Sequence, residues 1–229
     1  PPLPEGHSES VQGWISCSGG LNITNPASFD PTTGILYQPS APGCSGRMVQ
    51  PGINTDGDTH GCTSSEGDCW TTGTTISDWV QGGGVGWAGP QGLPMNKPPY
   101  NRVTAIDMDT GEHLWWVPIG EASERMKRHP ALQGVDLSNV GGGARAISMV
   151  TGSLLLTTQG SNGPAVLDAR NKLTGELVGS VELPAPGQYG MMSYMHEGHQ
   201  YIVVQVAQGG SFQGALAALR LPVADGGGH

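Results

Sequence analysis

Short runs of apolar and β-branched residues, bounded by glycine and other turn-forming residues, make up most of the chain after residue 145. Each run is too short for a stable helix and has the composition of a strand. The runs predict strands at 146–150, 154–158, 165–169, 177–183, 190–195, 200–206 and 215–219. The first four predict a complete four-stranded antiparallel blade, and the last three predict a terminal blade that lacks one strand.

Three turns of one pattern join pairs of apolar runs. In each, an Asp or Asn is followed three residues later by Thr-Gly, namely from Asp30 to Gly34, Asp107 to Gly111 and Asn171 to Gly175. The opening side chain can accept backbone N–H bonds two residues on, and the glycine can take the left-handed conformation that closes a hairpin with a bulge. Each copy therefore predicts a β-hairpin, and their recurrence predicts a propeller, solenoid or array.

The length argues that a propeller formed by this chain is incomplete. A closed propeller has roughly 4 to 8 blades of four strands. The 229 residues hold three such turns, 77 residues apart from Gly34 to Gly111 and 64 apart from Gly111 to Gly175. The content of 38 Gly and 18 Pro indicates an all-β chain rich in turns, with a helical piece expected only at 122–127. The predicted fold is all-β, with propeller blades of four antiparallel strands that do not close a ring alone.

Motifs outside the turns extend over most of the chain. They include Gly19-Gly20-Leu21-Asn22, the segment 29–37, Gln91-Gly92-Leu93-Pro94 with Lys97-Pro98-Pro99-Tyr100, and the stretches 192–195 and 198–204. In this order they resemble the carboxy-terminal part of the eight-bladed propeller of the quinoprotein dehydrogenases that use pyrroloquinoline quinone (PQQ). The resemblance implies that residues 1–229 are part of such a propeller. The residues themselves predict a disulfide-rich loop insertion at 43–90 and a flexible, glycine-rich tail at 223–229. It also implies that the outer strand of the terminal blade comes from the start of a full polypeptide, so that here a partner chain is the natural donor.

The resemblance further implies a function. The chain would be a part or subunit of a PQQ-dependent dehydrogenase that oxidises the hydroxyl of a small alcohol, sugar or polyol and passes electrons to a periplasmic acceptor such as a cytochrome c or a quinone. Its calcium or lanthanide ligands and its catalytic base would lie outside this chain, on the companion chain that supplies the remaining blades, so no catalytic residue is assigned here. The alternative is a non-catalytic propeller that serves as a binding or assembly scaffold, because a fold alone does not imply a function.

The same resemblance points to one wall of a cofactor site. Asn22 would reach the quinone, although Ile23 follows it and the spacing to Phe29 is one residue long, so Asn25 is the alternative. The Gly-rich segment that ends in Gly143 and Ala144 would bring backbone N–H groups close to the cofactor carboxylates, since no Cβ intervenes at glycine. Arg145 could pair with one of those carboxylates. The alternative is that these asparagines and glycines have a structural role and only form turns.

The four cysteines, Cys17, Cys44, Cys62 and Cys69, all lie in the polar first third of the chain. Four cysteines allow three pairings, and we expect Cys62 to pair with Cys69 and Cys17 with Cys44. The spacing is poor for zinc and lacks a Cys-x-x-Cys pair. Disulfides favour a periplasmic or secreted protein, and a chain that begins at Pro1 without Met suggests processing.

Other features change the picture less. Trp115 matches the position at which the family docks a tryptophan on the next blade, whereas its counterpart in the third copy is Gly179. Interior packing is expected for Trp70, Trp79 and Trp87, a solvated loop for Asn54, Asp56 and Asp58, and surface positions for His196 and His199. A net charge of −9 without a basic cluster argues against nucleic acid as a partner. The sequence contains no run of about 18 consecutive apolar residues, so it predicts no membrane-spanning helix.

Overall fold

The computed structural model describes residues 12–18, 20, 26–51, 79–81, 89–142, 145–160, 163–207 and 214–220. The chain divides into two compact units. Unit 1 comprises Pro1–Ser18 and Gly43–Met95, and unit 2 comprises Gly19–Pro42 and Asn96–His229. Unit 2 carries the predicted blades, so it is the unit that matters most for the function.

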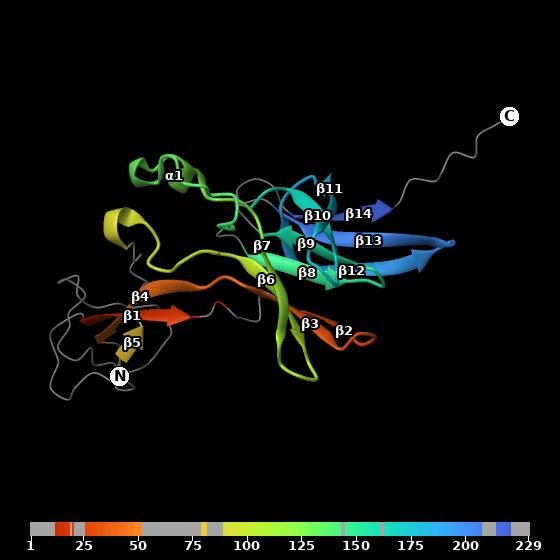
Figure 1. Cartoon of the computed structure of the whole chain (residues 1–229), viewed down its shortest axis with the longest axis horizontal. Coiled ribbons are helices and arrows are strands. Elements are labelled where there is room, and N and C mark those ends of the chain that lie inside the picture. Colours follow the sequence, from red (N-terminus) through yellow and green to blue (C-terminus); the bar gives the residue numbers. More distant parts are fainter. Residues whose placement is uncertain are drawn as a thin grey trace. The chain divides into compact units, whose positions relative to one another are not determined.

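The described part of unit 2 contains three antiparallel sheets, which we call blades I, II and III (Figure 1). Blade I has the strand order β2-β3-β6-β7, formed by β2 (Ser28–Asp30), β3 (Ile35–Ser40), β6 (Arg102–Asp107) and β7 (His113–Pro118). Blade II consists of β8 (Ala146–Val150), β9 (Leu154–Gln159), β10 (Val166–Asn171) and β11 (Leu177–Glu182). Blade III has three described strands, β12 (Gly187–His196), β13 (His199–Val206) and β14 (Ala215–Arg220). The all-β fold of open four-stranded blades is therefore confirmed, as are the strands predicted after residue 145.

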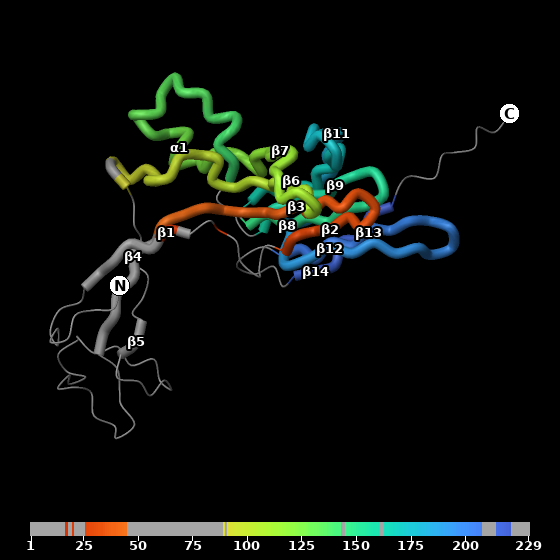
Figure 2. Tube along the Cα trace, turned by 60° about the horizontal axis from the view of Figure 1, so that its bottom comes forward, coloured from red at the N-terminus to blue at the C-terminus, as the bar shows by residue number. Residues whose placement is uncertain are grey.

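The blades stack in chain order. Strand β8 contacts β2 and β3 of blade I and β12 of blade III, and Figure 2 shows β8 and β12 close together. One core cluster joins blades I and II and includes Tyr37, Val103 and Leu155. A second joins blades II and III around Leu156 and Val204. Because strand side chains alternate between the two faces of a sheet, each of these blades buries an apolar face against its neighbour.

The three Asx-Thr-Gly turns are hairpins, as predicted. The backbone N–H groups of Thr32, Asp109 and Leu173 donate to the opening side chains of Asp30, Asp107 and Asn171 at 3.0, 2.8 and 2.9 Å. The glycines at 34, 111 and 175 have φ of 69°, 76° and 77°. The spacing of the copies, however, was misleading, because the first joins β2 to β3 and the second joins β6 to β7 of the same blade. Only the second and third copies occupy equivalent positions, since both join the last two strands of a blade.

Trp115 packs between blades I and II, as the docking prediction requires. Its ring centroid lies 5.8 Å from that of Tyr37, and a Cβ added to Gly175 would lie 2.8 Å from its Cε3 atom. At Gly179, the counterpart of Trp115 in blade II, an added Cβ would meet no atom of the described part of the chain within 4 Å. The docking contact made by blade I is thus missing from the described part of blade II.

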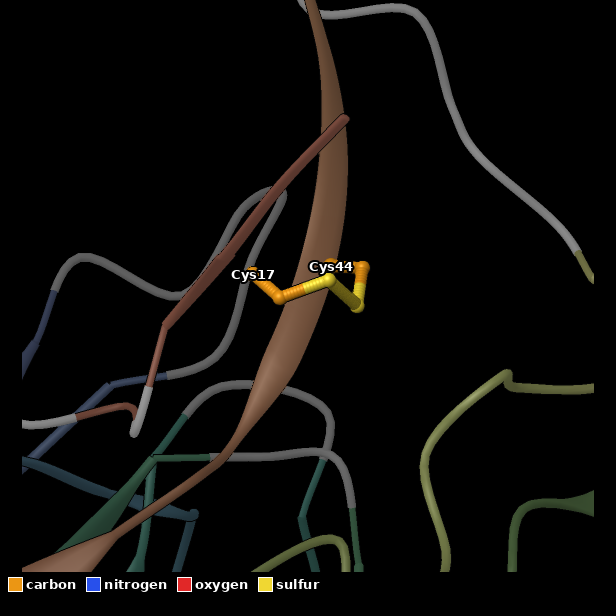
Figure 3. Close-up of a disulfide and its surroundings, with 2 residues drawn as sticks. All are labelled: Cys17 and Cys44. Carbon is orange, nitrogen blue, oxygen red and sulfur yellow. A yellow bond between two sulfur atoms is a disulfide. The ribbon is translucent and has the colours of Figure 1, made fainter. Parts of the chain in front are cut away.

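Unit 1 contains a three-stranded antiparallel sheet of β1 (Gln12–Ser18), β4 (Gly43–Pro51) and β5 (Trp79–Gln81), in the order β1-β4-β5. Cys17 and Cys44 lie directly opposite each other on β1 and β4 and form a disulfide (Figure 3). One of the two expected pairings is therefore confirmed. The other, between Cys62 and Cys69, lies outside the described residues, as do Trp70, Trp87 and the tail at 223–229.

The strands of unit 2 have two distinct ends. The hairpin turns described above lie at one end, which we call the turn end. The connections from β3 to β6, β7 to β8 and β9 to β10 leave from the opposite end, the loop end. The connection between β7 and β8 contains the short helix α1 (Glu124–Lys127), within the predicted 122–127, and a 3-10 helix at Pro130–Leu132. A further 3-10 helix lies at Pro90–Gly92 in unit 1.

Candidate functional site

Arg145 lies at the loop end, immediately before the first strand of blade II. Its carbonyl accepts a hydrogen bond of 2.7 Å from the backbone N–H of Gly160, which fixes the backbone where β8 begins. Its guanidinium carbon lies 5.7 Å from the ring centroid of Tyr189 on β12, within the range of a cation–π contact. Among the described residues, no carboxylate lies within ion-pair distance of Arg145. A half-buried guanidinium in this position can bind an anion, because its N–H groups match a carboxylate in a bidentate manner.

The other predicted site residues lie outside the described residues, namely Asn22, Asn25, Gly143 and Ala144. The flanks of the segment that holds the two asparagines are nevertheless described. On one side, the carbonyl of Gly20 accepts from the N–H of Ala41 at 3.4 Å. On the other, the Oγ of Ser148 donates to the carbonyl of Pro26 at 3.4 Å. Residue 26 is therefore held against β8, the strand that begins directly after Arg145.

A buried glutamine links blades I and II by a hydrogen bond at the loop end. Gln159 is 3% exposed, and its Nε2 donates to the carbonyl of Ile119 at 3.2 Å. That carbonyl also accepts from the N–H of Gly142 at 2.7 Å. A Cβ on Gly142 would lie 2.9 Å from Nε2 of Gln159, so a larger residue here would require the glutamine side chain to shift.

Oε1 of this glutamine and Oγ1 of Thr157, on the same strand, are buried and have no hydrogen-bond partner in the described part of the chain. Buried polar atoms in native proteins are normally paired with protein or water.

Two residues at the loop end, Gln159 and Tyr189, were not predicted from the sequence. The signal for Gln159 was a polar residue at the end of an apolar strand, whereas Tyr189 carried no signal that separated it from other exposed aromatics.

A second polar cluster lies at the turn end. Nζ of Lys172 lies 2.5 Å from Oδ2 of Asp30, and the two side chains are 9% and 6% exposed. The hydroxyls of Thr32 and Thr33 donate to the same carboxylate at 2.7 and 2.8 Å. The hydroxyl of Tyr37 donates to the carbonyl of Lys172 at 3.0 Å. Every polar group in this cluster is therefore matched, as buried charges require.

Hydrogen bonding, burial and charge in this cluster shift two pKa values. The hydrogen bond from Lys172, followed by those from Thr32 and Thr33, holds the pKa of Asp30 far below its ordinary value. Burial raises the pKa of Tyr37, and the negative charge of Asp30 adds to that rise. Because the cluster lies at the opposite end of the strands from Arg145, we assign it to the stability of the interface between blades I and II.

Among the remaining candidates, those that the structure describes form no metal site. His196 and His199 are directly opposed and exposed at the end of the β12–β13 hairpin, and within the described ranges no three His, Cys, Asp or Glu side chains gather as metal ligands. The stretch with Asn54, Asp56 and Asp58 lies outside those ranges. In the part of the chain that the structure describes, no helix is long and apolar enough to cross a membrane.

The chain is similar to PQQ-dependent enzymes in both sequence and fold. It is 34% identical over 122 residues to the glycerol dehydrogenase large subunit of Gluconobacter thailandicus, a match that covers 52% of this chain and 16% of that protein. It is 31% identical over 126 residues to the quinoprotein glucose dehydrogenase of Escherichia coli (strain K12), covering 54% and 15%. Its fold matches the crystal structure of the quinohemoprotein alcohol dehydrogenase from Comamonas testosteroni with a TM-score of 0.50 at 18% identity, over 86% of this chain and 25% of that one.

These matches cover only a small part of each relative. The matched regions span 16% and 15% of the lengths of the two curated relatives. The family model for the β-propeller domain of glucose, ethanol and alcohol dehydrogenases, in contrast, matches residues 3–202 of this chain. That range includes blades I and II and most of the β12–β13 hairpin. The chain therefore belongs to the β-propeller family of the PQQ-dependent quinoprotein dehydrogenases.

Proposed function

We propose that this chain is a part or subunit of a PQQ-dependent dehydrogenase that oxidises the hydroxyl of an alcohol, sugar or polyol. The observation that carries the proposal is Arg145, a guanidinium without a described carboxylate partner at the loop end of a family propeller. The names of the relatives, glycerol dehydrogenase and glucose dehydrogenase, support a polyol or sugar as the substrate class.

In this proposal, residues at the loop end bind a planar cofactor that carries carboxylates. The Arg145 guanidinium would bind one carboxylate, and the ring of Tyr189 would hold the guanidinium in place. The glycine-rich segment up to Gly143 and Ala144 would let backbone N–H groups approach a second carboxylate. Asn22, or Asn25 in its place, would contact the quinone. When bound, PQQ supplies the acceptor for the hydride that leaves the substrate.

The rest of the chemistry belongs to other blades in this proposal. A calcium or lanthanide ion would polarise the quinone as a Lewis acid, with ligands outside this chain. The general base would lie there as well, and a cytochrome c or quinone would accept the electrons. The exposed apolar side chains of blades I and III, such as Phe29, Trp116, Met192 and Leu216, support a companion chain that supplies the remaining blades, because exposed apolar patches of this kind mark interaction surfaces.

The disulfide supports a place outside the cytoplasm. Disulfides form and persist in oxidising compartments and are rare where thiols are kept reduced. The Cys17–Cys44 bond of unit 1 therefore fits a periplasmic or secreted protein, which is also where a dehydrogenase that uses a periplasmic electron acceptor must work.

The test is cofactor binding by the assembly in which the chain occurs. The tagged protein would be purified with its companions from the organism that produces it, and PQQ would be measured by absorption after denaturation. We expect stoichiometric PQQ in the native protein and a clear loss in Arg145→Gln. Arg128→Gln is the matched control, because Arg128 is exposed and pairs only with Glu124 among the described residues. A colourless assembly that does not bind added PQQ would overturn the proposal and favour the scaffold alternative.

A further inference from the structure

Gln159, the last residue of β9, is the buried glutamine that contacts blade I at the loop end. Residues separated by an even number of positions share a face of a strand. Gln159 therefore lies on the same face as Leu155, which belongs to the core between blades I and II. Because a buried carboxamide is costly unless its polar atoms are hydrogen-bonded, stability alone would favour an apolar side chain at this position.

The orientation of the carboxamide follows from its hydrogen bond to blade I. The carbonyl of Ile119 can only accept, so the atom that faces it is Nε2, at 3.2 Å. Oε1 is left without a donor among the described residues. The same carbonyl also accepts from the N–H of Gly142 at 2.7 Å, so it would stay paired without Gln159. The unpaired oxygen of the glutamine thus costs free energy, and the bond that the glutamine makes is not needed to satisfy the carbonyl.

Three glycines leave room for the carboxamide. A Cβ on Gly120 would overlap it, and Cβ atoms on Gly142 and Gly163 would lie 2.9 Å from Nε2 and 3.0 Å from Oε1. Gly120 has a φ of 75°, a conformation that glycine adopts without steric cost. Gly120 and Gly142 belong to the connection between β7 and β8, whereas Gly163 belongs to that between β9 and β10. The carboxamide therefore packs closely against the backbone of both connections.

Residues 159 and 160 hold the backbone on both sides of the segment 143–144. On one side, Nε2 of Gln159 and the N–H of Gly142 share the carbonyl of Ile119. On the other side, the N–H of Gly160 donates to the carbonyl of Arg145 at 2.7 Å. The backbone of Gly142 and that of Arg145 are therefore both fixed relative to the end of β9.

We propose that Gln159 is a positioning residue for cofactor binding, which fixes the backbone around Gly142 so that the Arg145 guanidinium meets a carboxylate in the correct geometry. The inference rests on the proposed function, in which Arg145 binds a carboxylate of PQQ, and adds a residue that acts through the backbone without touching the cofactor. Binding of a carboxylate by a guanidinium depends on the mutual geometry of the two planar groups, so a small displacement of Arg145 weakens it. The unpaired Oε1 agrees with this role, because violations of polar pairing are concentrated at functional sites.

Gln159→Met tests this role in the native assembly, with PQQ as the probe. Methionine has a similar length, removes the hydrogen bond and the unpaired oxygen together, and leaves the Ile119 carbonyl paired with Gly142. We expect the dissociation constant for PQQ to rise about tenfold, while the unfolding midpoint changes little. An unchanged dissociation constant, or a lower midpoint with unchanged PQQ affinity, would overturn the inference.

Thr157→Val is the matched control for this substitution. Thr157 lies on the same strand, is 1% exposed and also has an unpaired polar atom. Its side chain shares the face of Gln159 but makes no hydrogen bond to Ile119 in the described part of the chain. PQQ affinity in Thr157→Val should equal that of the native protein. A loss equal to that of Gln159→Met would assign the effect to the burial of polar groups on β9 and refute the positioning role.

Gln159→Glu adds a readout that a purely structural role would not change. A neutral glutamic acid can donate to the carbonyl of Ile119 as the amide does, whereas its carboxylate cannot, and burial favours the neutral form. Of the charged groups in the adjoining described segments, Arg145 keeps its charge at all pH values tested, and Glu121 is exposed and paired with Lys127. PQQ affinity relative to the native protein at the same pH should be near native at pH 5 and fall several-fold by pH 8. A ratio that does not vary with pH would contradict the inference.

Hydrogen exchange separates this inference from the proposed function. In the assembly freed of PQQ, the segment 140–147 should exchange faster in Gln159→Met than in the native protein or Thr157→Val, because the connection between β7 and β8 loses an anchor. Equal exchange in all three proteins would show that Gln159 anchors nothing. PQQ bound equally by the native protein and Gln159→Met would refute this inference alone, whereas a native assembly that binds no PQQ would refute the proposed function and the cofactor role of Gln159 with it.

Discussion

The ammonium of Lys172 and the carboxylate of Asp30 form a buried ion pair between turns of two neighbouring blades, 142 residues apart in the chain. Both groups belong to tight hairpin turns, so neither can move far without disturbing a hairpin. The hydroxyl of Tyr37 also binds the carbonyl of Lys172, which attaches the turn of blade II to the second strand of blade I. The pair therefore fixes the register between the two blades at the turn end.

Removal of one charge of this pair should destabilise the protein. Lys172→Met leaves the Asp30 carboxylate buried without its cation, and we expect the thermal unfolding midpoint to fall by several degrees. The double variant with Asp30→Asn should lose less than either single variant, because no charge is then buried without a partner. A double variant that loses the sum of both single effects would show that the pair does not interact.

Stability should also fall in acid through Asp30. Its pKa is lowered in the folded protein, so the carboxylate contributes stability that is complete above the ordinary value of 3.8 and is lost as the pH falls below it towards the folded value. Unfolding midpoints measured from pH 5 to pH 2 should therefore decline more steeply in the native protein than in Asp30→Asn. Parallel declines would contradict this assignment.

The hydroxyl of Tyr37 should make a small, separate contribution. Tyr37→Phe removes the donor to the buried carbonyl of Lys172 and leaves the ring in place. We expect a loss of about 1 kcal/mol in the free energy of unfolding, measured by denaturant titration. Tyr37→Leu, which also removes the ring contact with Trp115 at 5.8 Å, should cost clearly more, and equal losses would assign the whole effect to the hydroxyl.

Trp115 should matter for stability and assembly rather than for chemistry. Trp115→Ala removes an indole that packs on Tyr37 and Gly175, and we expect a loss of about 3 kcal/mol or more in the free energy of unfolding. Trp115→Phe keeps an aromatic ring and should lose less. An unchanged melting temperature in the alanine variant would refute the docking role, whereas PQQ bound per folded molecule should stay constant in both variants.

Tyr189 should affect cofactor binding through Arg145. Tyr189→Leu removes the aromatic face beneath the guanidinium, a contact worth about 0.5–1 kcal/mol at an exposed site. The dissociation constant for PQQ in the native assembly should rise about two- to fivefold, as measured by calorimetry. Tyr189→Phe keeps the ring and should bind PQQ like the native protein, so a loss in this variant would indicate a role for the hydroxyl instead.

Much of the local structure could be predicted from the sequence. The side chains of Asp107 and Asn171 bind backbone groups only two or three residues away, so these turns form from nearby residues alone. Local pattern and resemblance also predicted the strands between 146 and 220, the helix near Met126 and the docking of Trp115 on the next blade. Cys17 and Cys44 were one of several possible pairings until the β1–β4 register placed them opposite each other.

Contacts between distant residues were decided only by the tertiary structure. The sequence suggested three successive repeats, but the pairing of β3 with β6 placed the turns at Asp30 and Asp107 in one blade, across a long insertion that no local rule can span. Nothing near Lys172 indicated Asp30 as its partner, and nothing near Arg145 indicated Tyr189, because these pairs meet only when whole blades stack. Short-range hydrogen bonding thus determined the hairpins, whereas the burial of apolar faces between blades decided which charges and rings meet.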